Sequence, residues 1–82
     1  GRGVWIELTN LVIPGVNDDM DMIRQMCRWL VENGLANAPL HFSRFFPRYK
    51  MQDKSPTPIQ TLRVAKQVAE EEGITHVYLG NV

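Results

Sequence analysis

The alternation of two hydrophobic periods along the chain constrains its fold more than any other feature. Residues Val4 to Ile13 carry apolar and polar side chains in the period of two that is typical of a strand, and the next segment switches to the period of an amphipathic helix. The switch occurs again after Leu40, and a last strand follows at Thr75 to Leu79. The sequence therefore predicts β-α-β-α-β in one α/β domain, with strand starts about 35 residues apart, as in parallel βα units.

Turn and cap residues mark the ends of the predicted elements. In the stretch NLVIPGVNDD, Pro14 ends the first strand, and Asp18 is the predicted N-cap of the first helix. That helix is predicted to end at Asn33-Gly34, where a left-handed residue is favoured. The second strand, Leu40 to Phe45, is followed by a loop from Phe46 to Pro56. The apolar stripe of the first helix comprises Ile23, Met26, Cys27, Leu30 and Val31.

The second helix has its own start signal. Thr57-Pro58-Ile59-Gln60 has the pattern of a capping box with proline at the first helical position, and the helix is predicted to run to Glu72 and close at Gly73. Its predicted buried stripe comprises Leu62, Ala65, Val68 and Ala69.

Right-handed crossovers between strands in sequence order would place both helices on the same face of the sheet. The helix-covered face would hold Val4, Ile6, Leu8, Leu40, Phe42, Val77 and Leu79. The open face would hold Trp5, Glu7, Thr9, His41, Ser43, His76 and Tyr78. A face that mixes charged, hydroxyl, imidazole and aromatic groups is a poor core, but it suits the lumen of a barrel that binds a polar ligand.

Composition restricts the classes of partner. The 82 residues include nine basic and nine acidic side chains, so the chain lacks the positive field of an autonomous nucleic-acid binder. The single cysteine cannot form an internal disulfide, which favours a cytoplasmic setting. No apolar run, Leu11 to Ile13 included, is longer than three residues, which is far shorter than a membrane span. We therefore expect no nucleic-acid or membrane partner.

The carboxyl ends of the strands are the expected ligand-binding edge, because parallel α/β folds bind ligands there. These ends carry Asn10 to Gly15, Arg44 to Pro47, and Gly80-Asn81. Pro14-Gly15 is either an ordinary turn or a close approach of backbone to a ligand. Polar groups at all three strand ends favour the second interpretation.

Three stretches, VWIELTNLVIPGVND, LHFSRFFPRYKM and ITHVYLGN, resemble in this order the C-terminal portion of radical SAM enzymes. The branch concerned is the pyruvate formate-lyase activating enzyme homologues, the AmmeMemoRadiSam-system radical SAM enzymes, and the resemblance covers essentially the whole chain. It implies late strands of a partial (β/α)6 TIM-type barrel whose ends help to hold S-adenosylmethionine. The implied cofactor-binding residues are Thr9, Asn10, Ile13, Pro14, Gly15, His41, Ser43, Arg44 and Phe46.

The chain departs from this family in one respect. The CxxxCxxC motif, whose thiolates hold the [4Fe-4S] cluster, is absent, and Cys27 lies on an apolar helical stripe. We therefore expect a C-terminal fragment that has no catalytic or metal-ligating residue, binds no cofactor and is inactive alone. The missing N-terminal half of the barrel would be its partner. For the whole enzyme the resemblance implies S-adenosylmethionine, a [4Fe-4S] cluster and a 5′-deoxyadenosyl radical, with a protein glycine as one candidate substrate.

Other interpretations concern the histidines, the basic loop and the open face. His41 and His76 are a candidate metal pair, although a catalytic zinc site usually needs three protein ligands. Arg48 and Tyr49 are the predicted substrate-binding residues, and a solvated loop is the alternative. The chain as a whole could instead be a non-catalytic α/β module that binds a partner or dimerises through its open sheet face. On either interpretation an uncovered face predicts self-association.

Overall fold

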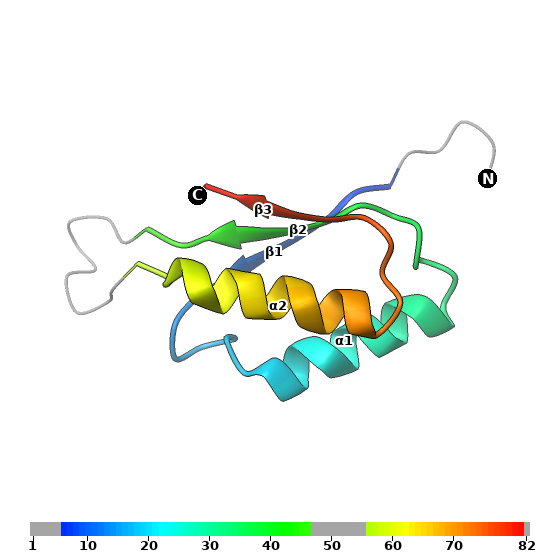
Figure 1. The fold of residues 1–82 in the computed structure, drawn as a ribbon, viewed down its shortest axis with the longest axis horizontal. Coiled ribbons are helices and arrows are strands. Elements are labelled where there is room, and N and C mark those ends of the chain that lie inside the picture. The colour runs from blue at the N-terminus through cyan, green and yellow to red at the C-terminus, as the bar shows by residue number, and fades with distance from the viewer. Residues whose placement is uncertain (1–5, 47–55, 82) are drawn as a thin grey trace.

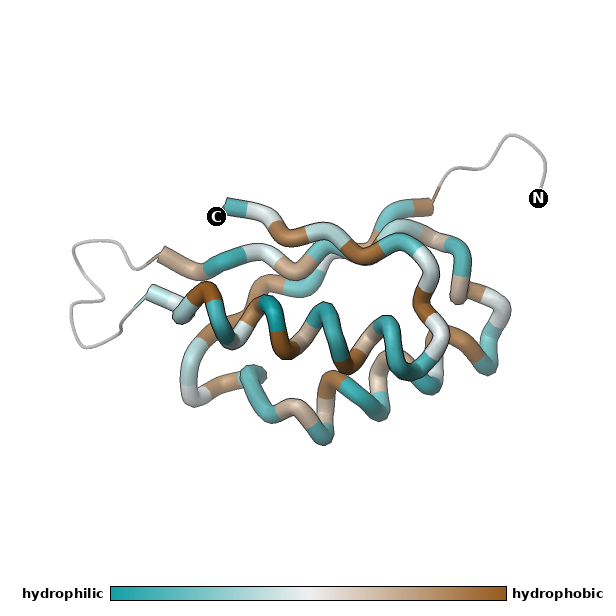
Figure 2. The backbone as a smooth tube through the Cα atoms, in the orientation of Figure 1, coloured by the Kyte–Doolittle hydropathy of each residue, from teal (hydrophilic) through white to brown (hydrophobic). Residues whose placement is uncertain are grey.

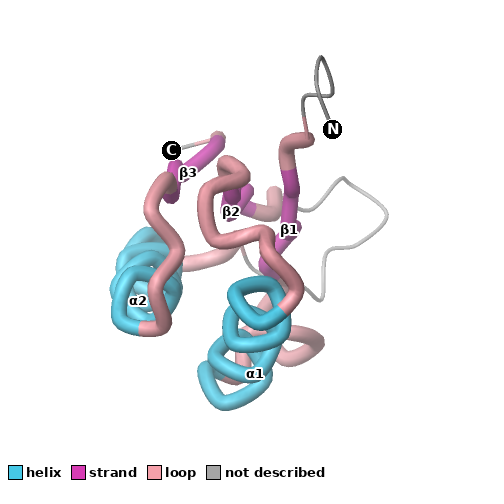
Figure 3. Tube along the Cα trace, turned by 90° about the vertical axis from the view of Figure 1, so that its right-hand side faces the viewer, coloured by secondary structure: helices cyan, strands magenta, loops and turns pink. Residues whose placement is uncertain are grey.

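The computed structural model describes residues 6–46 and 56–81, which form a three-stranded parallel sheet with two helices on one face (Figure 1). The elements are β1 (Leu8–Val12), α1 (Met20–Glu32), β2 (Leu40–Arg44), α2 (Ile59–Glu71) and β3 (Val77–Gly80). The strands lie in sequence order, and the view along the sheet shows both helices on the same side (Figure 3). This confirms the predicted α/β order. A three-stranded sheet does not by itself establish a barrel.

The parallel register explains which residues share a face. Leu8 pairs with Leu40 and Leu40 with Val77, while Thr9 pairs with His41 and His41 with Tyr78. Leu40 and Phe42 are buried against the helices, whereas Tyr78 is exposed on the other side. The predicted division of the two faces is confirmed for these strands. Val4 and Trp5 lie outside the described residues. Ile6, which was predicted for the helix-covered face, precedes β1 and is exposed.

The core lies between the sheet and the two helices. Hydrophobic and hydrophilic residues alternate along both helices, which is the pattern that lets each bury one side (Figure 2). α1 buries Ile23, Cys27 and Leu30, and α2 buries the stripe predicted for it: Leu62, Ala65, Val68 and Ala69. Cys27 is fully buried, and this burial raises the pKa of its thiol to about 11. The prediction that Cys27 belongs to the core is confirmed.

Two predicted helix caps are wrong. The N-cap of α1 is Asp19, whose Oδ1 accepts a hydrogen bond from the Asp21 backbone N–H at 2.8 Å. Asp18 instead accepts from the Gly15 N–H at 3.1 Å and so stabilises the preceding turn. The N-cap of α2 is Pro58, whose apolar ring makes no capping hydrogen bond. The predicted cap, Thr57, does not serve because its hydroxyl binds the Phe45 N–H and the Val12 carbonyl.

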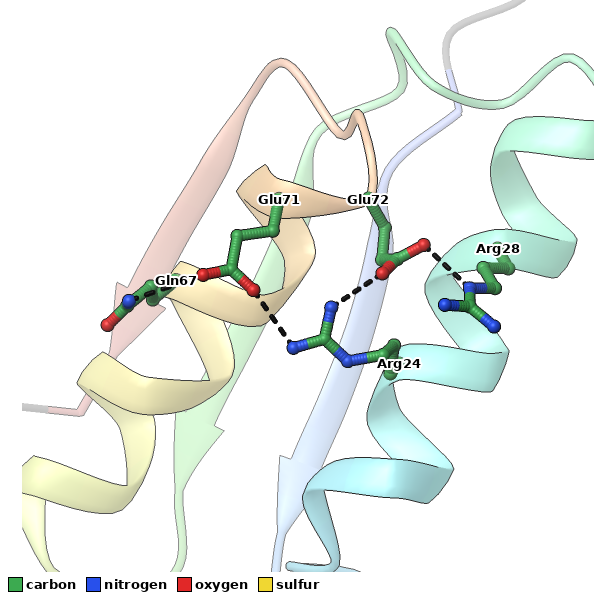
Figure 4. Close-up of polar contacts among 5 residues, drawn as sticks. All are labelled: Arg24, Arg28, Gln67, Glu71 and Glu72. Atoms are coloured by element: carbon green, nitrogen blue, oxygen red, sulfur yellow. Dashed lines mark hydrogen bonds and ion pairs between the residues drawn. The ribbon is translucent and has the colours of Figure 1, made fainter.

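An ion-pair cluster joins α1 to the end of α2 (Figure 4). Arg24 contacts Glu71 at 2.9 Å and Glu72 at 2.6 Å, and Arg28 contacts Glu72 at 2.8 Å. The hydrogen bond from Arg28, followed by that from Arg24, lowers the pKa of Glu72, and the hydrogen bond from Arg24 lowers the pKa of Glu71. Because acidic residues at a helix C-terminus oppose its dipole, the two arginines offset an unfavourable placement and fix the helix pair.

The outer edge of β1 is closed at its carboxyl end by a side chain. The Leu8 N–H donates to the carbonyl of Pro39, the residue that precedes β2. Even-numbered residues of β1 therefore direct their backbone N–H and carbonyl groups towards β2, and odd-numbered residues direct theirs away from it. Asn17 binds two of these outward groups: its Oδ1 accepts from the Ile13 N–H at 2.6 Å and its Nδ2 donates to the Leu11 carbonyl at 2.8 Å. The carboxamide thus takes the place that one residue of a parallel neighbouring strand would occupy.

Candidate functional site

The open face of the sheet is arranged in two layers. The layer nearer the carboxyl ends consists of Leu11, Ser43 and Gly80, which are register partners. A Cβ added to Gly80 would lie 3.1 Å from the Ser43 Oγ, so a side chain at this position would crowd Ser43 unless its hydroxyl moved. Two of the three side chains in this layer are therefore small, which keeps the sheet surface low at the edge where parallel α/β folds bind ligands.

The other layer carries larger polar groups. Thr9, His41 and Tyr78 are register partners, and the rings of His41 and Tyr78 stack with centroids 5.2 Å apart. The His41 Nε2 lies 2.9 Å from the Glu7 Oε1, close enough for a hydrogen bond. A pocket of about 410 Å³ is lined here by Glu7, Asn37, Pro39, His41, His76 and Tyr78. It lies toward the amino ends of the strands, away from the predicted cofactor edge.

The Pro14-Gly15 segment is a type II turn. The Val16 N–H donates to the Ile13 carbonyl at 3.0 Å, Pro14 occupies the second position, and Gly15 has the positive φ of 76° that the third position requires. No heavy atom lies within 4 Å of a Cβ built at Gly15, so its backbone conformation, and not crowding, explains the glycine. The turn reverses the chain from β1 towards α1 at the carboxyl edge.

Thr57 connects the carboxyl ends of β1 and β2. In this register the Phe45 N–H would next donate directly to the Val12 carbonyl, but the Thr57 hydroxyl lies between them. It accepts from Phe45 at 3.0 Å and donates to Val12 at 2.5 Å. Thr57 is fully buried, and its own N–H donates to the Phe45 carbonyl at 3.0 Å. The hydroxyl therefore continues the ladder while holding the two strand ends apart.

Arg44 and Phe46 form the rest of this edge. The Arg44 Nε donates to the Thr57 carbonyl at 2.6 Å, and its guanidinium carbon lies 4.6 Å from the centre of the Phe46 ring. The Asn81 Nδ2 donates to the Arg44 carbonyl at 3.4 Å, which ties the end of β3 to β2. Arg44 is thus held by backbone and by an aromatic ring, with Phe46 exposed beside it.

Asn10 lies apart from the other predicted cofactor-binding residues. It faces the helices, where its Nδ2 contacts the Met26 Sδ at 3.4 Å. Its Oδ1 is buried with no hydrogen-bond partner among the described residues, beside a small pocket of about 130 Å³ lined by Asn10, Asn17, Met22, Ile23 and Met26. The alternation of β1 places it on the opposite face from Thr9.

The structure therefore brings some of the predicted residues together and separates others. Ile13, Pro14 and Gly15 lie after the end of β1, and Arg44 and Phe46 lie at the end of β2. Thr9, His41 and Ser43 lie on the open face. Arg48 and Tyr49 lie outside the described residues. Sequence reasoning missed Thr57, because a threonine before proline at a helix start has the same appearance whether its hydroxyl caps the helix or joins two strands.

His41 and His76 line the same pocket, but they do not form a metal centre with a third ligand. Among residues 6–46 and 56–81, no group of three histidine, cysteine, aspartate or glutamate side chains could hold a metal ion. Neither described helix is long and apolar enough to cross a membrane.

Comparison with known proteins gives one informative relative. The uncharacterized protein MJ0808 of Methanocaldococcus jannaschii is 46% identical over 80 residues, which cover 98% of this chain and 24% of the relative. The chain thus spans about a quarter of the length of that protein. No protein-family profile matches the chain, and no solved structure matches it significantly.

Proposed function

We propose that the chain forms the late β-α-β-α-β part of a radical SAM enzyme of the pyruvate formate-lyase activating type. In this proposal it is a C-terminal fragment of a partial (β/α)6 barrel whose open face is the lumen. The single observation that carries the proposal is the placement of both described helices on one face. That placement leaves Glu7, Thr9, His41, Ser43 and Tyr78 on a polar surface that could not form a hydrophobic core within this chain.

The carboxyl edge supplies the cofactor wall in this proposal. The turn at Ile13 to Gly15 would approach S-adenosylmethionine with backbone, and the low layer formed by Ser43 and Gly80 would leave room beside it. Arg44 and Phe46 would stand at the rim, where a guanidinium already held against a ring is pre-organised to contact a carboxylate. Asn10 has no place in this wall, because its side chain is packed against Met26 of α1, whereas Arg44, on the same side of the sheet, lies at the strand end beside Thr57 and Phe46.

The remaining chemistry belongs to polypeptide outside this chain. A cysteine motif there would hold the [4Fe-4S] cluster, which supplies the electron for reductive cleavage of S-adenosylmethionine when bound. The 82-residue chain has one cysteine, and it is buried, so we propose that the chain alone is inactive. The length of the relative is consistent with a larger protein in which this segment is one part.

The experiment is anaerobic isolation of the full-length protein that contains this segment, followed by measurement of 5′-deoxyadenosine formed from S-adenosylmethionine with a strong reductant. We expect an iron-sulfur absorption band and formation of 5′-deoxyadenosine. A full-length protein that binds neither iron nor S-adenosylmethionine would refute the proposal.

The second candidate is a non-catalytic α/β module that binds a partner or a second copy through the open face. The exposed Leu11 and Tyr78 favour it, because both apolar side chains lie on that face without cover from described residues. Sedimentation of the purified chain over a range of concentrations distinguishes the two kinds of self-association. A discrete dimer with a reproducible dissociation constant supports the module, whereas a heterogeneous mixture is expected of an uncovered lumen face.

A further inference from the structure

We propose that the pocket at the amino half of the open face is a binding site for a small organic cation with a flat aromatic body. The site is the pocket of about 410 Å³ lined by Glu7, Asn37, Pro39, His41, His76 and Tyr78. Its volume lies within the range of about 300 to 1,000 Å³ that is usual for small-molecule sites. The inference does not depend on the radical chemistry proposed for the carboxyl edge.

The ring surface at this site is already ordered. His41 and Tyr78 stack at 5.2 Å between centroids with an angle of 28° between their planes, and half of the Tyr78 surface stays exposed. A flat ring placed against Tyr78 would extend this stack and bury apolar area without new ordering of the tyrosine. A positive charge over the same ring would be attracted by its electron-rich face.

Glu7 supplies a carboxylate to the described lining of the pocket. Its Oε1 lies 2.9 Å from the His41 Nε2, and a carboxylate offers about four lone-pair positions, so it can accept from a ligand N–H while keeping other partners. The described residues that line the pocket include no lysine or arginine. A ligand ammonium group therefore meets a carboxylate, whereas an anionic ligand meets no fixed cation among them.

The part of the pocket wall that contains Asn37 is held by hydrogen bonds. The Thr75 hydroxyl donates to the Asn37 Oδ1 at 3.0 Å, and the Thr75 N–H donates to the Ala36 carbonyl at 3.0 Å. These bonds join the segment before β2 to the segment before β3 and fix Asn37 at the pocket. A wall held in this way reduces the ordering that a ligand would otherwise have to impose.

The test is a set of nuclear magnetic resonance titrations of the isotope-labelled chain at pH 8, at a dilution where sedimentation shows the monomer, with three probes that share one ring. Phenethylamine is the cation, 2-phenylethanol the neutral probe and phenylacetate the anion. We expect phenethylamine to shift the resonances of His41 and Tyr78 with a roughly millimolar dissociation constant, the alcohol to bind at least about threefold more weakly, and phenylacetate to give no saturable shift.

Variants separate the two sources of affinity. Glu7→Gln should weaken the binding of phenethylamine roughly threefold and remove its higher affinity relative to 2-phenylethanol. Tyr78→Leu should weaken the binding of both probes. Glu70→Gln, a matched change on the exposed side of α2, should alter neither. Equal binding of amine and acid, shifts confined to residues outside the pocket, or an unchanged amine affinity in Glu7→Gln would each overturn the inference. None of these results bears on S-adenosylmethionine cleavage by the full-length protein.

Discussion

Replacing Thr57 by valine should destabilise the chain far more than replacing it by serine. Valine keeps the shape of threonine but has no hydroxyl, so the Phe45 N–H and the Val12 carbonyl would lose their shared partner inside the protein. An unpaired buried polar group costs about 1 to 3 kcal/mol, and two such groups imply a loss of about 2 to 4 kcal/mol, because partial closure of the strands recovers some of the cost.

Serine is the matched control. It retains the hydroxyl and removes one methyl group, and we expect this loss to lower the free energy of unfolding by about 1 kcal/mol. Urea unfolding followed by far-ultraviolet circular dichroism gives the free energy of unfolding of each variant and of the original chain. The two variants should differ by at least about 1 kcal/mol, because only valine leaves the two backbone groups unpaired.

Two results would refute this reasoning about Thr57. A valine variant as stable as the serine variant would show that the hydroxyl does not hold the strand ends. A serine variant as unstable as valine would assign the effect to the missing methyl group. The total free energy of unfolding of a chain of this size is only about 4 to 12 kcal/mol. A valine variant that shows no folded baseline, while the serine variant is folded, would therefore agree with the expectation.

Three further predictions follow from other parts of the structure. Cys27 should resist modification by a thiol reagent at pH 8 in the folded chain and react at once in denaturant. The reason is that burial raises the pKa of its thiol to about 11 and shields the sulfur from the reagent. Fast labelling of the native chain would contradict the buried placement of Cys27. Glu72→Gln should destabilise the chain at pH 6 but less at pH 3. The folded pKa of Glu72 lies below its ordinary value of 4.5, so its stabilising contribution is complete above that value and is lost as the pH falls through the folded pKa; a pH-independent difference in urea midpoint would count against the ion pairs of Figure 4. Gly15→Ala should lower the free energy of unfolding by about 1 kcal/mol, because Gly15 has a positive φ. Gln25→Ala, on the exposed side of α1, should lower it by less than about 0.5 kcal/mol. Equal unfolding free energies for the two variants would contradict the positive φ that the type II turn requires.

Hydrophobic periodicity was sufficient to predict the element order and the division of the sheet faces. The alternation of Leu40, His41, Phe42 and Ser43 specifies one buried and one open face whatever the loops do, and Ile23, Cys27 and Leu30 specify the buried side of α1. These patterns can be read from the sequence because the direction of each side chain follows from the local backbone geometry of a strand or a helix.

The carboxyl edge was harder to predict because its contacts join residues far apart in the chain. Asp18, Asp19 and Thr57 are residue types whose side chains commonly bind nearby backbone N–H groups, but the Thr57 hydroxyl binds the Phe45 N–H, 12 residues away. Asn10 was assigned to the ligand edge because of its neighbours in sequence, but the period of the strand places it against α1. Tertiary geometry decided the case of Thr57, whereas local turn geometry decided the two aspartates and the strand period decided Asn10.

The Asn17 carboxamide has a consequence for any strand that adds to the free edge of β1. Because it already satisfies the Leu11 carbonyl and the Ile13 N–H, an incoming parallel strand has to stop before the level of Val12. One side chain therefore limits how far a parallel neighbouring strand can extend towards the carboxyl edge. It also opposes edge-to-edge pairing of copies at this corner of the sheet, where unprotected backbone would favour aggregation.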